Sequence, residues 1–371
     1  LRGSSAKGTF MRMAEKPQAL QFGGMAVLEG VMMRSPRFWS VAVRAPSGEI
    51  LVKTEGIEKL WIFRQKWLML PFMRGTLALL DTMLLGNRAM RFAGEIAADE
   101  RFQTAQALED SKPKEGSKQS RLDRWYESLT PEKKKQAEKA LIAITVVVSL
   151  ALSVTIFDFG PEGLAQWLQH MLKFGNTATN AVAEVVKLAM FIGYLFLIRR
   201  IPAILDVFRY HGAEHAAINA MEHQAELTPE NCLAHSRFHL RCGTNFAIMV
   251  VLVGFLVFIP LPRDLFVPEG APAWVMLVTR ILVRLAVLPL VAGISYEIIR
   301  AAGRAKNKQL LTWVLTPGMW TQVITTEEPA AKHAEVAIEA LKAVELAEAG
   351  GELMNSDVEA MAILAKERRE S

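Results

Sequence analysis

Residues 141–157 have the sequence LIAITVVVSLALSVTIF, which contains no charged side chain. Together with Ala140, this run reaches the length that a helix needs to cross the roughly 30 Å hydrocarbon core of a bilayer. Three more apolar runs follow it, and the full set of predicted spans is Leu141–Phe157, Ala181–Ile198, Phe246–Leu261 and Trp274–Ile299. The alternative is a soluble protein with four buried helices, but runs of this length favour a membrane protein.

Two of these runs contain charged residues. Glu184 and Lys187 are three residues apart and can pair along one helix face. Arg280 and Arg284 form an i,i+4 pair in the last run, where Pro289 predicts a kink. Charged side chains within a span are expected to face protein, a carboxylate or lipid phosphate rather than acyl chains. These charges also motivate transport as a third hypothesis for the function.

The composition supports the membrane class. Hydrophobic residues make up 51% of the 371 residues and charged residues only 22%, which excludes a disordered chain. The net charge is +5, but the lysines and arginines flank the apolar runs, so we expect no nucleic-acid partner. Only two cysteines occur, Cys232 and Cys242, which excludes a disulfide scaffold and leaves buried thiols or metal ligands.

The basic flanks predict the orientation of the spans. Lysines precede the first run, two arginines follow the second, and more basic residues follow the fourth; they are Lys133, Lys134, Lys135, Lys139, Arg199, Arg200, Arg300, Arg304, Lys306 and Lys308. The loops 158–180 and 262–273 offer only Lys173 and Arg263. By the positive-inside rule, both termini and the segment 199–245 face the cytoplasm.

We therefore predict a mainly α, polytopic membrane protein with about four transmembrane helices, a cytoplasmic histidine-rich helical hairpin and a small N-terminal β-element. The predicted parts are a disordered N-terminus (1–20), the β-element (21–60), an amphipathic helix (61–97), a polar linker with a charged helix (98–139), a transmembrane domain (140–300) that includes the hairpin 206–243, and a cytoplasmic C-terminal region (301–371).

Three expectations concern these flanking parts. The amphipathic helix either lies on the inner leaflet or packs against the β-element. Thr316-Pro317-Gly318 predicts a turn, followed by a short strand over Gln322–Thr325 that joins the N-terminal sheet. The tail from Glu335 is rich in Ala, Glu and Lys and predicts a pair of helices that form a solvated cap.

Five of the seven histidines fall within residues 211–239. Among them, His211-Gly-Ala-Glu214-His215 is an H-x-x-E-H motif. Helical spacing puts its two imidazoles on one face, one turn apart, where both can bind a metal with Glu214 beside them as a general base. Glu222 lies further along the same face. His223 in the loop, together with the remote His170 and His333, is expected on the surface.

A second helix is predicted after Thr228, which is a good cap before Pro229. It would carry His235 and His239 at i,i+4, with Cys242 close to the same face, and pack against the first helix as an antiparallel hairpin. The converging imidazoles predict a divalent transition metal, zinc first, with iron or manganese as alternatives. Arg237 and Arg241 are either clamps for an anionic substrate or contacts with lipid headgroups.

Six separated motifs resemble those of the bacterial YqhQ family. They are Gly23–Arg34, Tyr210–His215, Glu230-Asn231, His235–Thr244, Tyr296–Arg300 and Pro317–Trp320. This family consists of polytopic membrane proteins of unknown function that are described as predicted metal-dependent enzymes. The resemblance implies a location in the inner membrane and a functional role for Glu29, Arg34, Glu297 and Arg300. From its position, Glu297 could instead pair with Arg300 or reach the hairpin as an extra ligand.

The leading hypothesis is a metal-dependent hydrolase with His211, His215, His235 and His239 as ligands and Glu214 as the base. Its position at the lipid boundary favours a lipid-linked or membrane-protein substrate, with membrane lipid as a partner. The competing hypothesis is a non-enzymatic scaffold or regulator with a structural or sensing metal site. A homo-oligomer and a membrane-protein partner both stay open.

Overall fold

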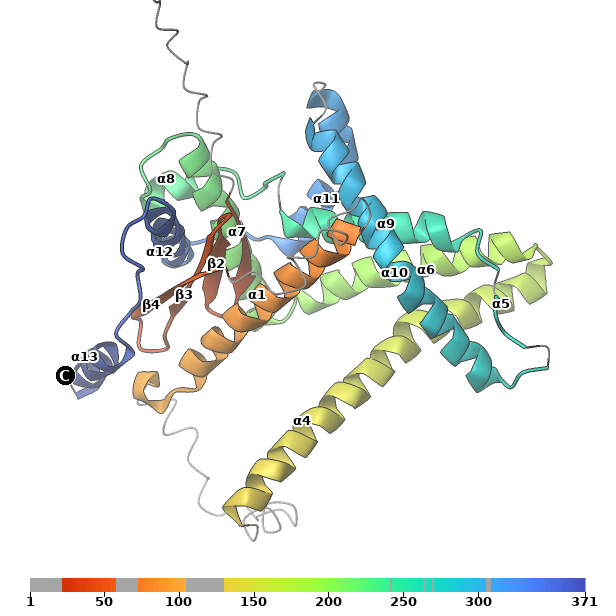
Figure 1. The fold of residues 1–371 in the computed structure, drawn as a ribbon, viewed down its shortest axis with the longest axis horizontal. Helices are drawn as coiled ribbons and strands as arrows, with labels where there is room; N and C mark the ends of the chain where they lie inside the picture. The colour runs from red at the N-terminus through yellow and green to blue at the C-terminus, as the bar shows by residue number, and fades with distance from the viewer. Residues whose placement is uncertain are drawn as a thin grey trace, which may run out of the picture.

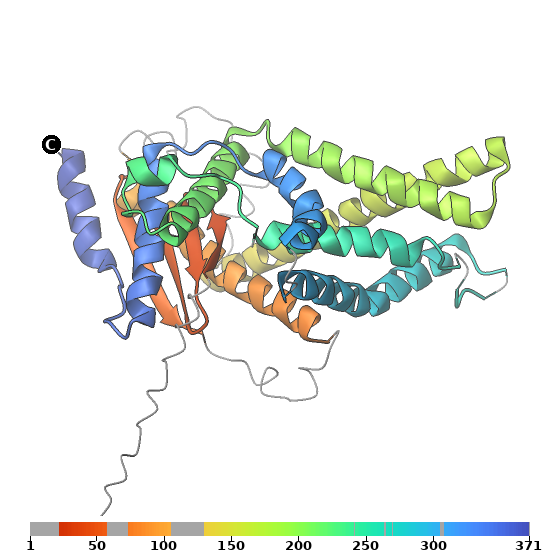
Figure 2. The ribbon, with the colours of Figure 1, turned by 90° about the horizontal axis from the view of Figure 1, so that it is seen from above.

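The computed structural model describes residues 22–57, 73–104, 130–240, 242–262, 265–268, 270–304 and 308–370. The predicted disordered N-terminus and most of the predicted linker lie outside these residues. The described part is mainly helical, with one small antiparallel sheet close to the N-terminus, as predicted. The sheet and the helices that cover it form one end of the molecule, and long apolar helices extend away from it (Figures 1 and 2).

The sheet has four strands in the order β1-β2-β3-β4, joined as hairpins. The strands are β1 (Gly23–Val27), β2 (Gly30–Arg34), β3 (Phe38–Arg44) and β4 (Ile50–Gly56). Two tight turns use left-handed backbone conformations, at Glu29 with φ of 50° and at Gly48 with φ of 103°. Gly48 lies in the turn that Pro46-Ser47-Gly48 predicts.

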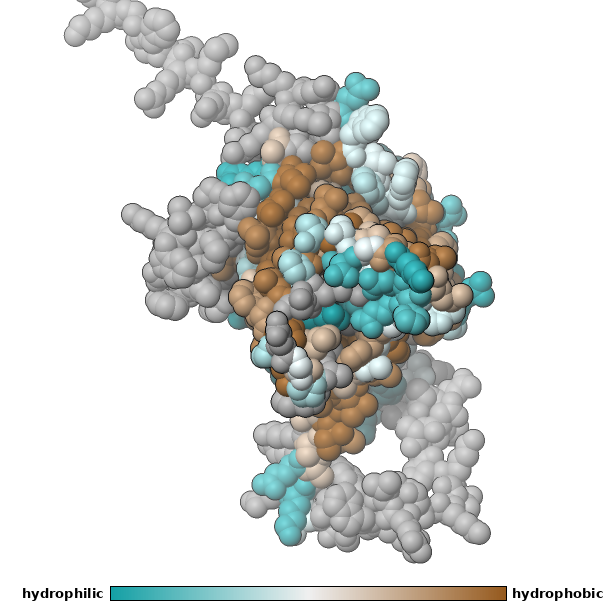
Figure 3. All heavy atoms as spheres, turned by 90° about the vertical axis from the view of Figure 1, so that its right-hand side faces the viewer, coloured by the Kyte–Doolittle hydropathy of each residue, from teal (hydrophilic) through white to brown (hydrophobic). Residues whose placement is uncertain are grey.

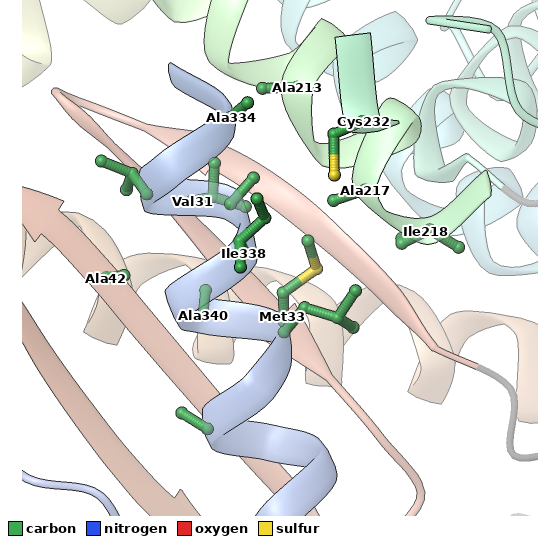
Figure 4. Packing of buried hydrophobic residues seen from close by; sticks show 14 of the residues in the cluster. Val31, Met33, Ala42, Ala213, Ala217, Ile218, Cys232, Ala334, Ile338 and Ala340 are labelled. Atoms are coloured by element: carbon green, nitrogen blue, oxygen red, sulfur yellow. The ribbon is translucent and has the colours of Figure 1, made fainter. Parts of the chain in front are cut away.

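Both faces of the sheet are buried. Helices α7 (Pro202–Glu222) and α12 (Ala331–Glu348) cover one face, and α1 (Met73–Ala98) covers the other with part of α13 (Val358–Glu370). Side chains alternate along the strands, so Val31 and Met33 point toward α7 and α12 while Met32 points toward α1. Figure 4 shows Val31, Met33 and Ala42 against residues of α7 and α12.

The prediction that the tail forms a solvated cap is wrong. The tail does contain two helices, but α12 is buried against the sheet through small and branched residues such as Ala337, Leu341 and Val344. His333 is buried as well, with its side chain 1% exposed, rather than on the surface. The alanines allow α12 to approach the strands closely, and the glutamates and lysines between them masked this apolar face in the sequence.

Part of helix α1 packs against the β-element, which is one of its two predicted positions. Its C-terminal half packs on the sheet through Leu85, Ala89 and Ala93, and the short 3-10 helix η3 (Glu100–Phe102) follows it. Near its start, Gly75 lies so close to Gly293 of α10 (Ala273–Arg304) that no side chain would fit between them. The helix therefore connects the sheet to an apolar helix, and residues 61–72 of the prediction lie outside the described residues.

The apolar helices are α4 (Pro131–Val154), α5 (Gly160–Leu172), α6 (Asn176–Ile198), α9 (Gly243–Phe258), α10 and α11 (Lys308–Thr325). A π-helical turn, η4 (Thr155–Phe159), joins α4 to α5 without a break. Within the described residues, three stretches are long and apolar enough to cross a membrane: Ala143–Leu172, Asn176–Ile198 and Val278–Ala301. The third predicted span is the shorter apolar helix α9, with 16 residues.

The apolar helices expose large apolar side chains on their outer surfaces. None of the most apolar window of Ala143–Leu172 is buried inside the molecule. Large apolar side chains such as Leu141, Val147 and Leu152 are more than half exposed. Figure 3 looks onto the end of these helices and shows apolar side chains along the flanks with polar ones at the tip. Such a surface is compatible with a membrane protein.

The charges within the spans face carboxylates, as predicted. Glu184 on α6 is 2.9 Å from the Lys187 ammonium and 3.3 Å from the Arg284 guanidinium. Arg280 pairs with Glu162 of α5 at 3.4 Å. These ion pairs connect α5, α6 and α10 inside the apolar region.

The strand predicted over Gln322–Thr325 is wrong, because these residues form the last turn of helix α11. Val323 and Ile324 are β-branched and favoured a strand, and Thr316-Pro317-Gly318 suggested a turn. In the structure, Pro317 lies inside the helix and Gly318 lies directly against Asn245 of α9. Packing against α9 therefore overrides the local preference.

Candidate metal centre

Helix α7 carries the H-x-x-E-H motif, and its small residues allow it to pack closely against the sheet and α12. Pro202 stands in its first turn, where a missing N–H costs nothing. Ala213 and Ala217 are buried against the sheet and α12, which brings the helix close to β1. His211 and His215 lie one turn apart with ring centroids 4.5 Å from each other, which confirms that they share one face.

Backbone carbonyls fix the orientation of both rings. The Nδ1–H of His211 donates to the carbonyl oxygen of Thr325 at 2.9 Å, and the Nδ1–H of His215 donates to the carbonyl oxygen of Arg237 at 2.7 Å. Each ring thus carries its proton on Nδ1 and has a lone pair on Nε2. This arrangement is typical of histidines that bind metals through Nε2.

Cys242 completes the group. Its Sγ lies 3.1 Å from Nε2 of His211, and one ligand atom from each of His211, His215 and Cys242 lies within 4.8 Å of the other two. Cys242 is the cap of α9 and accepts the backbone N–H of Thr244. Nε2 of His215 is buried without a hydrogen-bond partner. Two imidazoles and a thiol are a donor set that zinc accepts, and a metal would satisfy this orphaned nitrogen.

Glu214 is buried beside these ligands, with the residue 2% exposed. Its carboxylate accepts the backbone N–H of Gly24 in β1, and its Oε2 has no hydrogen-bond partner. Burial raises the pKa of Glu214 to about 8. A side chain at Gly24 would overlap this carboxylate, so glycine is required there. The β-element therefore contacts the site through β1.

The predicted second helix is wrong in its length. Thr228 does cap a helix, but this helix, α8 (Pro229–Leu233), ends before His235. Residues 234–240 instead run along α7, whose Asn219 side chain donates to the carbonyl oxygens of Ser236 and Phe238. Donors on α7 thus bind these carbonyls and that of Arg237, in place of the N–H groups that a helix would supply within the segment.

The path of residues 234–240 places His235 and His239 in different surroundings. The His239 ring lies next to the group, with its centroid 5.8 Å from that of His215. His235 points elsewhere and lies beside His223, with ring centroids 5.3 Å apart. His235 is therefore outside the group, which corrects its prediction as a ligand of this site.

The other predicted site residues have varied positions. Oε1 of Glu222 is 3.6 Å from Nε2 of His239, and Glu222 does not belong to the group of three. Arg237 donates to the carbonyl oxygen of Thr326 at 2.9 Å. Arg241 lies outside the described residues. His170 and His223 are exposed, as predicted.

Three of the four residues implied by the family resemblance lie at junctions between elements. Tyr210 of α7 donates to Glu29 in the β1–β2 turn at 3.1 Å, and Arg34 of β2 pairs with Asp81 of α1 at 2.5 Å. Glu297 of α10 pairs with Arg74 of α1, with Nε 2.6 Å from Oε1. Arg300 is half-buried on α10.

Sequence reasoning missed three residues that shape the site. The side chain of Gln322 is fully buried and bonds to both the N–H and the carbonyl oxygen of His239. Thr325 supplies the carbonyl that orients His211. Gly212 lies directly against the carbonyl oxygen of Glu327. A backbone carbonyl leaves no signal in a sequence, and Gln322 falls in the segment predicted as a strand.

Comparisons with known proteins find matches that extend over most of this chain. A family model described as "Protein of unknown function (DUF1385)" matches residues 70–347. The "Uncharacterized protein YqhQ" of Bacillus subtilis (strain 168) is 30% identical over 321 residues, which cover 86% of this chain and 90% of that protein. No solved structure matches the chain.

Proposed function

The chain belongs to the family described as "Protein of unknown function (DUF1385)", and we propose that it is a metal-dependent membrane hydrolase. His211, His215 and Cys242 hold a divalent transition metal in this proposal, with zinc as the first choice and iron or manganese as alternatives. The observation that carries it is the pair of imidazoles whose Nδ1 protons are bound to backbone carbonyls. Their Nε2 lone pairs and the Cys242 thiol are ready for a metal without any rearrangement of protons on the rings.

A metal bound there would supply a Lewis acid that activates water for hydrolysis. Glu214 acts as the general base and acid. Its pKa of about 8, raised by burial, allows its carboxyl group to take and return a proton near neutral pH. A buried carboxyl oxygen without a partner weakens the fold, and a purely structural site has no need of it.

The substrate class follows from location. Helix α9 begins at Gly243, directly after the ligand Cys242, so an α9 that enters the bilayer places the site at its surface. The topology in this proposal has four spans, with α9 as the short one, and both termini on the cytoplasmic side of the bacterial inner membrane. The lysines at the start of α4, before its apolar run, and the arginines after α6 support it. A lipid-linked molecule or a membrane protein would reach such a site, and nucleic acid is not a partner.

Metal content tests the ligand set. We expect close to one metal per chain by elemental mass spectrometry on detergent-purified protein, and little metal in His215→Ala or Cys242→Ser. His170→Ala is the matched control, since this histidine is exposed on α5, away from the buried group. Equal metal in the wild type and Cys242→Ser, both purified without added metal, would contradict the proposal.

Turnover tests the enzymatic part. We expect purified protein to release products from a total membrane extract, detected by mass spectrometry. Glu214→Gln should keep its metal and lose about 10²–10⁴-fold in rate, which is the usual contribution of a general base. Unchanged product formation with Glu214→Gln would remove Glu214 from this role.

A structural or sensing site in a non-enzymatic scaffold is the second candidate. The burial of His215 and the nearby His239 ring favour it, because His239 could serve as a fourth ligand and close the coordination shell. X-ray absorption spectroscopy separates the two functions. Four protein ligands favour the scaffold, and three with an exchangeable water favour the hydrolase.

A further inference from the structure

Two histidines outside the buried group face each other at the end of α7. His223 follows the last residue of α7 and is exposed, and His235 follows α8 and is half-buried. Their ring centroids are 5.3 Å apart and their planes are inclined by 46°. Their separation along the chain is only twelve residues, but they come from different elements, so the fold brings them together.

The protons on both rings are fixed in the same way as in the buried group. The Nδ1–H of His223 donates to the carbonyl oxygen of Asn219 at 2.7 Å, and the Nδ1–H of His235 donates to that of Asn231 at 2.7 Å. Each ring therefore has its lone pair on Nε2. Four histidines of this region thus share one pattern, with Nδ1 bound to a backbone carbonyl and Nε2 as the acceptor nitrogen.

The spacing of the two rings fits a shared metal ion. Two imidazoles bound through Nε2 to one tetrahedral zinc, with Zn–N distances of about 2.1 Å, have centroids about 5 Å apart. The observed 5.3 Å agrees with this value. One exposed and one half-buried protein ligand, with water in the other positions, bind a metal more weakly and exchange it faster than the three ligands of the buried group.

Two more ligand-type side chains, Glu222 and His239, lie between the end of α7 and the buried group. Glu222 precedes His223 and lies 3.6 Å from Nε2 of His239, and the His239 ring lies 5.8 Å from that of His215. Burial increases across these residues, from exposed His223 to fully buried His215. His215 and Cys242 have little access to solvent of their own.

We propose that His223 and His235 form a second, exposed site for a divalent transition metal, from which the buried group is loaded. The entry role rests on the proposed function, since it needs a metal in the buried group. The surface site itself does not, because its two ligands lie outside that group.

Zinc titration of metal-free full-length protein in detergent, followed by calorimetry, tests the surface site. We expect a tight and a weaker class of zinc sites. His223→Ala and His235→Ala should each weaken the second class at least tenfold and leave the tight class intact, whereas Cys242→Ser should remove only the tight class. His170→Ala is the matched control, because His170 is exposed on α5. A wild type without the weaker class, or a weaker class that survives both substitutions, would overturn the surface site.

The rate of loading tests the entry role. Zinc uptake into the tight class, followed by stopped flow with a competing zinc indicator, should be several-fold slower in His223→Ala than in His170→Ala, with the same final occupancy. Equal rates would overturn the entry role. Absence of the tight class alone would instead count against the proposed function, so the two failures are distinguishable.

Discussion

At the scale of single residues, the candidate centre depends on groups that are not ligands. Two backbone carbonyls accept the Nδ1–H of His211 and His215 and so fix the tautomers of both rings. Glycines allow neighbouring groups to approach the site closely. Gly24 makes room for the Glu214 carboxylate, and Gly212 makes room for the chain that follows α11. The motif H-G-A-E-H therefore has a structural requirement at its second position as well as chemistry at the other polar positions.

Gly212→Ala should destabilise the protein by about 1–3 kcal/mol, the usual cost of forcing an extra methyl group into a packed interior. The new Cβ would overlap the carbonyl oxygen of Glu327, which belongs to backbone and cannot swing aside. A thermal melt in detergent measures this loss. Gly94→Ala is the control, since Gly94 lies in helix α1 with open space around it and should be neutral or slightly stabilising. Equal melting temperatures for the two variants would contradict the close approach.

His333 should make stability depend on pH. Burial lowers its pKa below the usual 6.5, although Asp206 opposes this with Oδ1 at 3.1 Å from Nε2. The unfolded chain then binds this proton more readily than the folded one, so stability is lost as pH falls through about 6.5 toward the lower, folded value. The melting temperature should fall less on acidification in His333→Gln than in the wild type. His170→Gln should behave as the wild type, and a fall of the same size in all three proteins would exclude His333 as a cause.

At the scale of elements, helix spacing, caps and turns could be predicted from local sequence. Sites where a side chain from another element replaces a local hydrogen bond could not. The i,i+4 spacing of His211 and His215, the cap at Thr228 and the hairpin turn at Gly48 follow from local chemistry, and the structure confirms them. The segment 234–240 has helical spacing but forms no helix, because Asn219 and His215 of α7 bind its carbonyls. A local sequence pattern does not show that donors on α7 compete for these carbonyls.

Helix α11 shows the same principle and can be tested at Gln322. This side chain bonds to the N–H and carbonyl oxygen of His239 and to the side chain of Asn245, which joins α11 to the site and to α9. Gln322→Leu leaves these buried partners unsatisfied and should cost about 3 kcal/mol.

Gln322→Leu should also weaken metal binding by about tenfold. The segment that positions Arg237 and Cys242 would lose its hydrogen bonds to the Gln322 side chain. Chemical denaturation and metal titration measure the two effects. Val323→Ala is the neighbouring control, since Val323 is half-exposed on the same helix. A Gln322→Leu protein as stable as this control would mean that α11 does not anchor the site.

At the scale of the whole molecule, the sheet unit and the apolar helices have different environments. The sheet is buried on both faces, whereas the helix that begins at Pro131 presents apolar side chains outward. Ion pairs connect the two parts at Arg34–Asp81 and Arg74–Glu297, both through α1. A unit fixed in this way to membrane helices would hold its metal group at a constant depth, which suits a substrate anchored in the bilayer.

This arrangement predicts which parts face each side of the membrane. The α5–α6 turn lies at the far end of the apolar helices, and the α12–α13 connection lies beside the sheet (Figures 1 and 2). Gly175→Cys should therefore react with a membrane-impermeant maleimide in intact bacterial cells, whereas Glu352→Cys should react only after the cells are opened. The wild type is the control, because Cys232 and Cys242 are both buried and should stay unlabelled. The reverse pattern would invert the topology, and labelling of both sites only after lysis would mean that the α5–α6 turn does not cross the membrane.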